Sequence, residues 1–306
     1  MARKSDRKIA IPSSILLVLL LVLSLFIACV LAPILELVAG KFIKLNHDGR
    51  TVLVWVTLGA FLIFCIIFRN SLKSDIRGSL NLPFYKVLRY FLVGVLVGAV
   101  LTGISVAIVV LFKLRGVEFS PYEMIWRTAL LTLWIAVFQE IIHRGFIFQG
   151  LRREVTTFPA IIISSVFYSL LHFTYPREVG RAMSASFDFL AGFKNVAHML
   201  DGFRDFSELL PDATGYFLLG VVLSLSCVIT GSLYMAIGIH AFLVFINESR
   251  LITISPRHFA GRETIFGSSG TILETFMGSI LCWILLLLVI IALLSVRVSS
   301  RDREAE

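Results

Sequence analysis

The chain has 306 residues, of which 58% are hydrophobic and 16% are charged, and its mean hydropathy is +0.90. Soluble globular chains are about 45–50% apolar and about 25% charged, so this composition excludes both a soluble domain and a disordered chain. The net charge of +8 comes from basic residues at the ends of apolar runs and not from a dense basic patch, which argues against nucleic acid as a partner. We therefore expect an all-α, polytopic membrane helical bundle.

Apolar segments of about 20 residues predict transmembrane helices, because the hydrocarbon core of a bilayer is about 30 Å thick. The first segment follows a basic stretch and continues through Cys29, beyond the roughly 7–15 apolar residues of a signal peptide, so we expect a membrane anchor. In the third segment, the spacing of Gly94 and Gly98 favours close approach of a neighbouring helix within the bundle. Eight spans are predicted, near residues 13–38, 51–68, 87–112, 124–143, 158–175, 215–230, 232–251 and 273–296.

Two connections between the predicted spans are longer than turns. Residues 69–86 are basic with interspersed apolar residues, which suits a segment lying on an anionic membrane surface. Residues 176–214 are acidic and aromatic, and they predict either an interfacial helix or a lid over a site inside the membrane.

Ionisable residues inside apolar spans are the strongest functional signal, because each costs a few kcal/mol or more at membrane depth. Glu140 and Arg144 share one helical face near the end of the fourth predicted span, where a structural ion pair is an equally good interpretation. His172 and His240 lie in the fifth and seventh spans, and a single histidine there is more often a packing residue. Together, however, one glutamate and two histidines can deprotonate water and stabilise an oxyanion, or bind a metal as a His₂Glu zinc set does.

The order of these residues resembles that of the CAAX protease and bacteriocin-processing family (CPBP, or Abi), over roughly residues 120–250. Gln139-Glu140-x-x-x-Arg144 is similar to the family's Glu-Glu-x-x-x-Arg motif. Tyr168-x-x-x-His172 is similar to its Phe-x-x-x-His motif, and His240 to the start of its His-x-x-x-Asn motif. We therefore divide the chain into three N-terminal helices (1–119), a catalytic core with an insertion at 176–214 (120–251), and a final segment with a loop, the last span and a cytoplasmic tail (252–306).

Three positions depart from the family motifs. Gln139 replaces the glutamate that the resemblance assigns to water activation, and a neutral amide cannot act as a base. Tyr168 replaces the phenylalanine and adds a hydroxyl. Val244 replaces the asparagine that would donate to an oxyanion, and Asn247, seven residues after His240 on the same helical face, is a candidate substitute.

The resemblance implies an intramembrane endopeptidase that hydrolyses a peptide bond of a membrane-associated protein or peptide near the cytoplasmic boundary. In this hypothesis Glu140 is the base, His172 assists it, His240 stabilises the oxyanion, and Arg144 holds Glu140. No cofactor is firmly expected; a divalent metal such as zinc on Glu140, His172 and His240 is the open alternative. Because of Gln139 and Val244, an inactive membrane scaffold or immunity-type binding protein is the second hypothesis, and a transporter the third.

Lys and Arg residues predict the orientation of the chain, because they are enriched in cytoplasmic loops. One side of the predicted topology carries 15 of them, against 9 in the short loops of the other. We therefore expect an integral protein of the bacterial cytoplasmic (inner) membrane, with both termini in the cytoplasm. Reporter fusions after residue 306 should give a cytoplasmic signal and fusions near residue 190 the opposite one; a cytoplasmic signal at residue 190 would overturn this topology.

Overall fold

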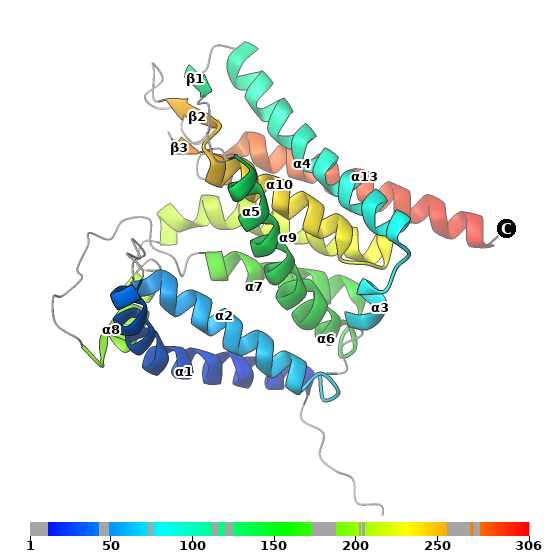
Figure 1. Ribbon diagram of the computed structural model, residues 1–306. Coiled ribbons are helices and arrows are strands. Elements are labelled where there is room, and N and C mark those ends of the chain that lie inside the picture. Colours follow the sequence, from blue (N-terminus) through cyan, green and yellow to red (C-terminus); the bar gives the residue numbers. More distant parts are fainter. Residues whose placement is uncertain are drawn as a thin grey trace, which may run out of the picture.

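The computed structural model describes most of the chain as a helical bundle with one small sheet (Figure 1). The described residues are 12–42, 49–72, 76–111, 116–119, 125–172, 188–201, 203, 206–255, 270–271 and 276–305. Parts of both long connections, residues 73–75 and 173–187, lie outside the described residues.

The helices correspond to the eight predicted spans. Five are long and apolar enough to cross a membrane, and three apolar helices are shorter. The prediction of a helical membrane bundle is confirmed. The helices are α1 (Ser13–Phe42), α2 (Gly49–Ile67), α3 (Ile76–Leu80), α4 (Phe84–Leu111), α5 (Ile125–Glu140), the π-helix η1 (Ile141–Phe148), α6 (Gln149–Arg152), α7 (Thr157–His172), α8 (Ala191–Asp201), α9 (Phe206–Thr230), α10 (Tyr234–Ser249) and α13 (Ile280–Ala305).

Two predicted boundaries are wrong for one physical reason: hydropathy falls where polar residues begin, but the helical backbone continues. The fourth span was expected to end at residue 143, whereas α5, η1 and α6 form one continuous apolar helix from Ile125 to Arg152. The sixth was expected from residue 215, and its helix begins at Phe206. The last span was expected at 273–296; its apolar part covers Ile280–Arg297, so its end agrees and its start lies later than expected. The fourth span matters most, because its extension places Glu140 in the middle of a helix and not at its end.

A three-stranded antiparallel sheet joins distant parts of the chain at one end of the bundle (Figure 1). Strand β1 (Gly116–Phe119) pairs with β2 (Ile252–Ser255), and β2 pairs with β3 (Gly270–Thr271). The segment after residue 252 was expected to be a loop before the last span, so the sheet corrects that prediction. Ile252 and Thr253 suit a strand as β-branched residues, but their partner lies more than 100 residues away.

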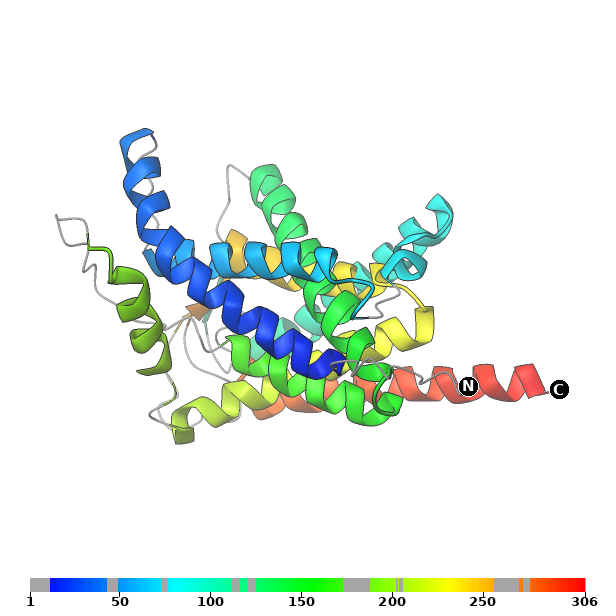
Figure 2. The ribbon, with the colours of Figure 1, turned by 90° about the horizontal axis from the view of Figure 1, so that it is seen from below.

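Helix α10 lies at the centre of the bundle, where it packs against α4, α5 and α9, while α9 also packs against α7 and α13. Helices α1 and α2 form a pair at one side, and α8 packs against both (Figures 1 and 2). The ring of Phe193 on α8 lies edge-on to Phe26 of α1, with centroids 5.9 Å apart. The helix found inside the 176–214 insertion thus lies against the first two spans.

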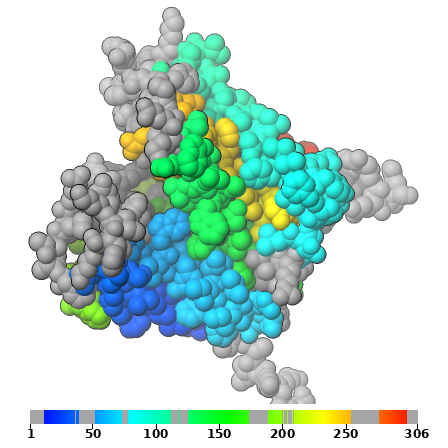
Figure 3. All heavy atoms as spheres, viewed as in Figure 1, coloured from blue at the N-terminus to red at the C-terminus, as the bar shows by residue number. Residues whose placement is uncertain are grey.

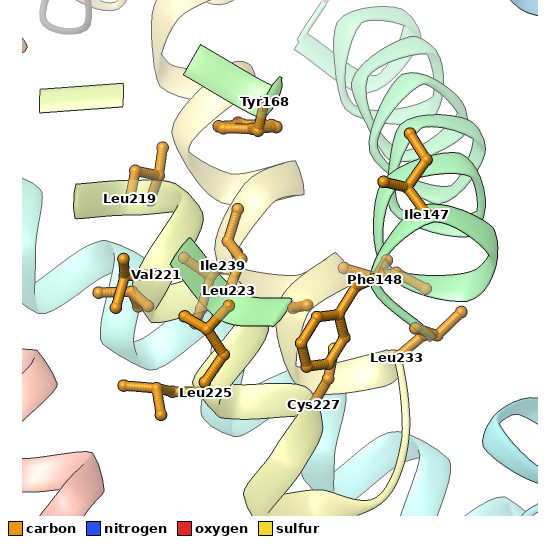
Figure 4. Packing of buried hydrophobic residues seen from close by; sticks show 14 of the residues in the cluster. Ile147, Phe148, Tyr168, Leu219, Val221, Leu223, Leu225, Cys227, Leu233 and Ile239 are labelled. Atoms are coloured by element: carbon orange, nitrogen blue, oxygen red, sulfur yellow. The ribbon is translucent and has the colours of Figure 1, made fainter. Parts of the chain in front are cut away.

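Buried apolar side chains from α7, η1, α9 and α10 fill the interior (Figure 4). Apolar side chains also lie on the outside of the bundle: Trp126, Leu130 and Trp134 of α5 are more than half exposed. Helix α5 is visible at the surface between α2 and α4 (Figure 3). Exposed aromatic and aliphatic residues along a spanning helix are what lipid contact requires, since the hydrocarbon is as apolar as the side chains.

Glycines bring α4 and α10 into backbone contact. A Cβ atom at Gly94 would collide with the carbonyl oxygen of Met235 and lie 2.9 Å from the backbone nitrogen of Ile239, and one at Gly238 would collide with the carbonyl oxygen of Phe91. The contact predicted from the Gly94 and Gly98 spacing therefore lies within the bundle, with α10 as the partner helix.

We expect Gly94→Ala to destabilise the protein by about 1–3 kcal/mol, because the added methyl group must push two backbones apart. Gly103→Ala is the matched control on the same helix, since nothing lies within 4 Å of a Cβ there. Thermal unfolding in detergent measures both. Equal melting temperatures for the two variants would show that the α4–α10 contact is looser than described.

Candidate active site

Glu140 and Arg144 form an ion pair inside the bundle. The Nη1 atom of Arg144 lies 3.2 Å from Oε1 of Glu140, and the two side chains are 2% and 0% exposed. They lie where α5 passes into the π-helix η1, and residues 142–148 of η1 are all buried. A helix surrounded by protein on every side has no polar face towards solvent, so the charges neutralise each other within the core.

His240 of α10 is the second partner of the same carboxylate oxygen. Its Nδ1 donates to Oε1 of Glu140 at 2.7 Å, and the histidine is 3% exposed. The other oxygen, Oε2, is buried and has no hydrogen-bond partner among the described residues. Since a carboxylate only accepts, the hydrogen bond places the histidine proton on Nδ1 and leaves Nε2 as an acceptor in the neutral ring.

Arg144 connects this pair to two further helices. Its Nη2 atom donates to the carbonyl oxygen of Gly220 on α9 at 3.2 Å. Its guanidinium carbon lies 4.3 Å from the centre of the Tyr168 ring on α7, a cation–π distance. The Arg144 guanidinium is rigid and planar, donates hydrogen bonds in two directions and stacks on a ring. It therefore orients the Glu140 carboxylate more strictly than the compact ammonium group of a lysine would.

The Tyr168 ring is the centre of a cluster of histidines. Its centroid lies 4.4 Å from that of His172, 5.2 Å from His143 and 6.1 Å from His240. His172, at the end of α7, donates from Nδ1 to the Tyr168 carbonyl oxygen at 2.9 Å and stacks on Tyr216 of α9 with centroids 4.3 Å apart. The structure thus brings together the predicted residues Glu140, Arg144, His172 and His240 around one aromatic ring.

His143 belongs to this cluster and was missed in the sequence. It is buried, its Nδ1 donates to the Gln139 carbonyl oxygen at 2.8 Å, and its Nε2 is buried with no hydrogen-bond partner among the described residues. The signal was present as a histidine three residues after Glu140, which shares a helical face with it. It was overlooked because the span was expected to end at that point, where a histidine would be exposed.

A metal ion does not fit this arrangement. No three His, Cys, Asp or Glu side chains in the described part of the chain are grouped so that they could hold one ion. The proposed ligand set of Glu140, His172 and His240 is therefore not grouped as a metal site among the described residues.

A comparison with protein families assigns the core of this bundle. Residues 121–246 match the family model for type II CAAX prenyl endopeptidase Rce1-like proteins. This segment belongs to the CAAX protease family. It contains Glu140, Arg144, Tyr168, His172 and His240. No curated protein and no solved structure gives a significant match to the chain.

The positions that depart from the CAAX protease motifs lie beside the cluster. Gln139 is half-buried, and its backbone carbonyl orients His143. Val244 lies one turn beyond His240 on α10 and is partly buried. Asn247 lies about 10 Å along the helix axis from His240 and donates to Glu248 at 3.2 Å, so it lies at the helix end, away from the Glu140–His240 pair.

The cluster combines an ion pair with polar atoms that lack partners. Oε2 of Glu140 and Nε2 of His143 are acceptors, and the hydroxyl of Tyr168 can also donate. A buried polar group without a partner costs about 1–3 kcal/mol, so such groups in a protein interior require an explanation. A water molecule or a polar substrate group bound at any of these atoms would supply the missing hydrogen bond.

Removing one partner of the buried pair should cost more than removing both. We expect Arg144→Leu to destabilise the protein by about 3–5 kcal/mol, because it leaves a buried carboxylate without its counter-charge. The double variant Glu140→Leu/Arg144→Leu should recover a large part of this loss. Thermal unfolding of the single and double variants in detergent tests the pair, and a double variant less stable than Arg144→Leu would contradict it.

Proposed function

We propose that the protein is an intramembrane endopeptidase that hydrolyses a peptide bond of a membrane-associated protein or peptide. The observation that carries the proposal is a fully buried glutamate with one oxygen bonded to Arg144 and His240 and the other without a partner in the described chain. This glutamate lies in a segment that belongs to a protease family, which supports the general class of reaction.

In the proposed reaction, Oε2 of Glu140 holds the water and takes its proton. His240 and Arg144 both donate to Oε1, which fixes the carboxylate and leaves Oε2 for the water. Gln139 cannot take this role, because an amide does not accept a proton at neutral pH. His172 assists next to Tyr168, and stacking on Tyr216 fixes its ring.

The position of Glu140 supports cleavage inside the bilayer and not at its boundary. Glu140 lies twelve residues before Arg152 at the end of the helix, and eight of these residues form the π-helix η1, so Glu140 lies several turns inside the helix. With both termini in the cytoplasm, as the basic residues predict, the substrate would enter from the cytoplasmic side of a bacterial inner membrane. An extended segment of the substrate must therefore reach into the bundle.

A second function, an inactive scaffold or immunity-type binding protein, is favoured by one observation. Gln139 and Val244 replace two side chains that the family resemblance assigns to the chemistry. In this case the buried ion pair would serve the fold alone, and the partner would be another membrane protein.

The experiment that separates the two functions compares protein termini in membranes of cells that carry the wild-type chain or Glu140→Gln. We expect termini that depend on the wild-type chain, and loss of acid–base catalysis by about 10²–10⁴-fold in the variant. Glu248→Gln is the matched control, because Glu248 is exposed at the end of α10. Both variants must be recovered as folded protein at wild-type levels; Glu248→Gln should melt like the wild type, whereas Glu140→Gln should melt lower because it leaves the buried Arg144 charge without its partner.

The protease proposal fails if wild-type and Glu140→Gln cells produce the same termini. It also fails if Glu248→Gln removes the new termini as completely as Glu140→Gln, because the effect would then not come from the cluster.

A further inference from the structure

Hydrolysis of a peptide bond needs a hydrogen-bond donor that the family motif no longer supplies in this chain. Negative charge develops on the carbonyl oxygen when water attacks, and enzymes stabilise it with donors placed in advance. The motif position that would carry an asparagine holds Val244, which has no polar group. Asn247 lies away from the Glu140–His240 pair, so the donor must come from elsewhere in the cluster.

The histidines of the cluster are not suitable donors in their neutral forms. His143, His172 and His240 each donate from Nδ1, to two backbone carbonyls and the Glu140 carboxylate respectively. Carbonyl and carboxylate oxygens only accept, so each ring carries its proton on Nδ1 and presents Nε2 as an acceptor. Arg144 uses two of its five N–H donors in hydrogen bonds to Glu140 and Gly220, and its guanidinium carbon lies 4.3 Å from the centre of the Tyr168 ring.

The hydroxyl of Tyr168 is an uncharged donor on the ring that the histidines of the cluster surround. The side chain is 1% exposed, and its hydroxyl has no hydrogen-bond partner among the described residues. The ring is fixed by the Arg144 guanidinium on its face and by the rings of His143, His172 and His240 around it. A phenylalanine would fill the same space without leaving a buried polar group unpaired.

We propose that Tyr168 is a catalytic residue whose hydroxyl donates a hydrogen bond to the oxyanion of the tetrahedral intermediate, in place of the side chain lost at Val244. This inference rests on the proposed endopeptidase function and deepens it. A tyrosine can act in this way because its hydroxyl remains protonated at neutral pH and donates without changing charge.

The reaction adds water across the peptide bond. The water oxygen forms a bond to the carbonyl carbon, Glu140 takes one water proton, and the π electrons of the carbonyl move to its oxygen, which accepts the hydrogen bond from Tyr168. When the intermediate collapses, the C–O double bond re-forms, the C–N bond breaks, and the proton held by Glu140 passes to the leaving nitrogen. Tyr168 keeps its own proton throughout.

The test measures kcat and KM of Tyr168→Phe on synthetic peptides that span the cleavage sites found by the comparison of termini. We expect kcat to fall about 10²–10³-fold, the loss typical of one oxyanion donor, with KM changed less than threefold. The melting temperature should stay the same or rise, because the removed hydroxyl has no partner to lose. A structural role of the hydroxyl would instead lower the melting temperature.

Two further variants sharpen the result. Tyr168→Phe/Val244→Asn restores the residues of the family motif, and it should regain at least tenfold in kcat over Tyr168→Phe. Ser165→Ala is the control, because it removes another buried hydroxyl without a described partner, one turn earlier on α7 and packed against Gly220. It should keep wild-type kcat.

The inference is overturned if Tyr168→Phe keeps more than a tenth of the wild-type kcat, or if Ser165→Ala loses as much activity as Tyr168→Phe. Should Tyr168→Phe be poorly folded, the double variant decides: no recovery of kcat in a folded protein rejects the donor role. Glu140→Gln, measured in parallel, separates the two proposals. If it is inactive while Tyr168→Phe is active, only the role of Tyr168 fails; if it is active, the role of Glu140 as the base fails; and if the wild type itself does not cleave these peptides, the endopeptidase function fails.

Discussion

The arrangement of the core depends on one buried carboxylate oxygen that accepts hydrogen bonds from two side chains, an arginine and a histidine. Oε1 of Glu140 bonds to Arg144 on its own helix and to His240 on α10, more than 90 residues away. A lone carboxylate at this depth would not remain ionised, so the fold must place counter-charge and donors around it. Arg144 then fixes α7 through Tyr168 and α9 through Gly220, and four segments are held by one charge.

The hydrogen bond from His240 to Glu140 also requires a particular position of helix α10. His240 can donate to Glu140 only if α10 lies deep in the bundle, and the glycines of α4 and α10 allow that by letting two backbones touch. In a membrane this contact has no strong hydrophobic driving force, because lipid is as apolar as the helices. Close packing and the buried hydrogen bond together replace the driving force that water supplies to soluble proteins.

The sequence was sufficient for the features that depend on composition along the chain. Hydropathy located the eight apolar helices, and the cost of burying charge pointed to Glu140, Arg144 and His240. It was insufficient for features that depend on contacts between segments far apart in the chain. The helix continues past Glu140 because neighbouring helices bury its polar residues, and this continuation is what makes His143 part of the cluster. The sheet depends on pairing between segments more than 100 residues apart, which leaves no local pattern.

The glycine contact between α4 and α10 also bears on how much of the chain forms the working unit. The family match begins at residue 121, after α4, yet α4 is the helix in closest backbone contact with the helix that carries His240. A matched segment grafted into another membrane protein would keep every ionisable side chain of the cluster but lose the surface that sets the depth of α10. The segment that matches the family is therefore shorter than the unit that positions His240. Substitutions in α4 where it touches α10 should affect the cluster although α4 lies outside the match.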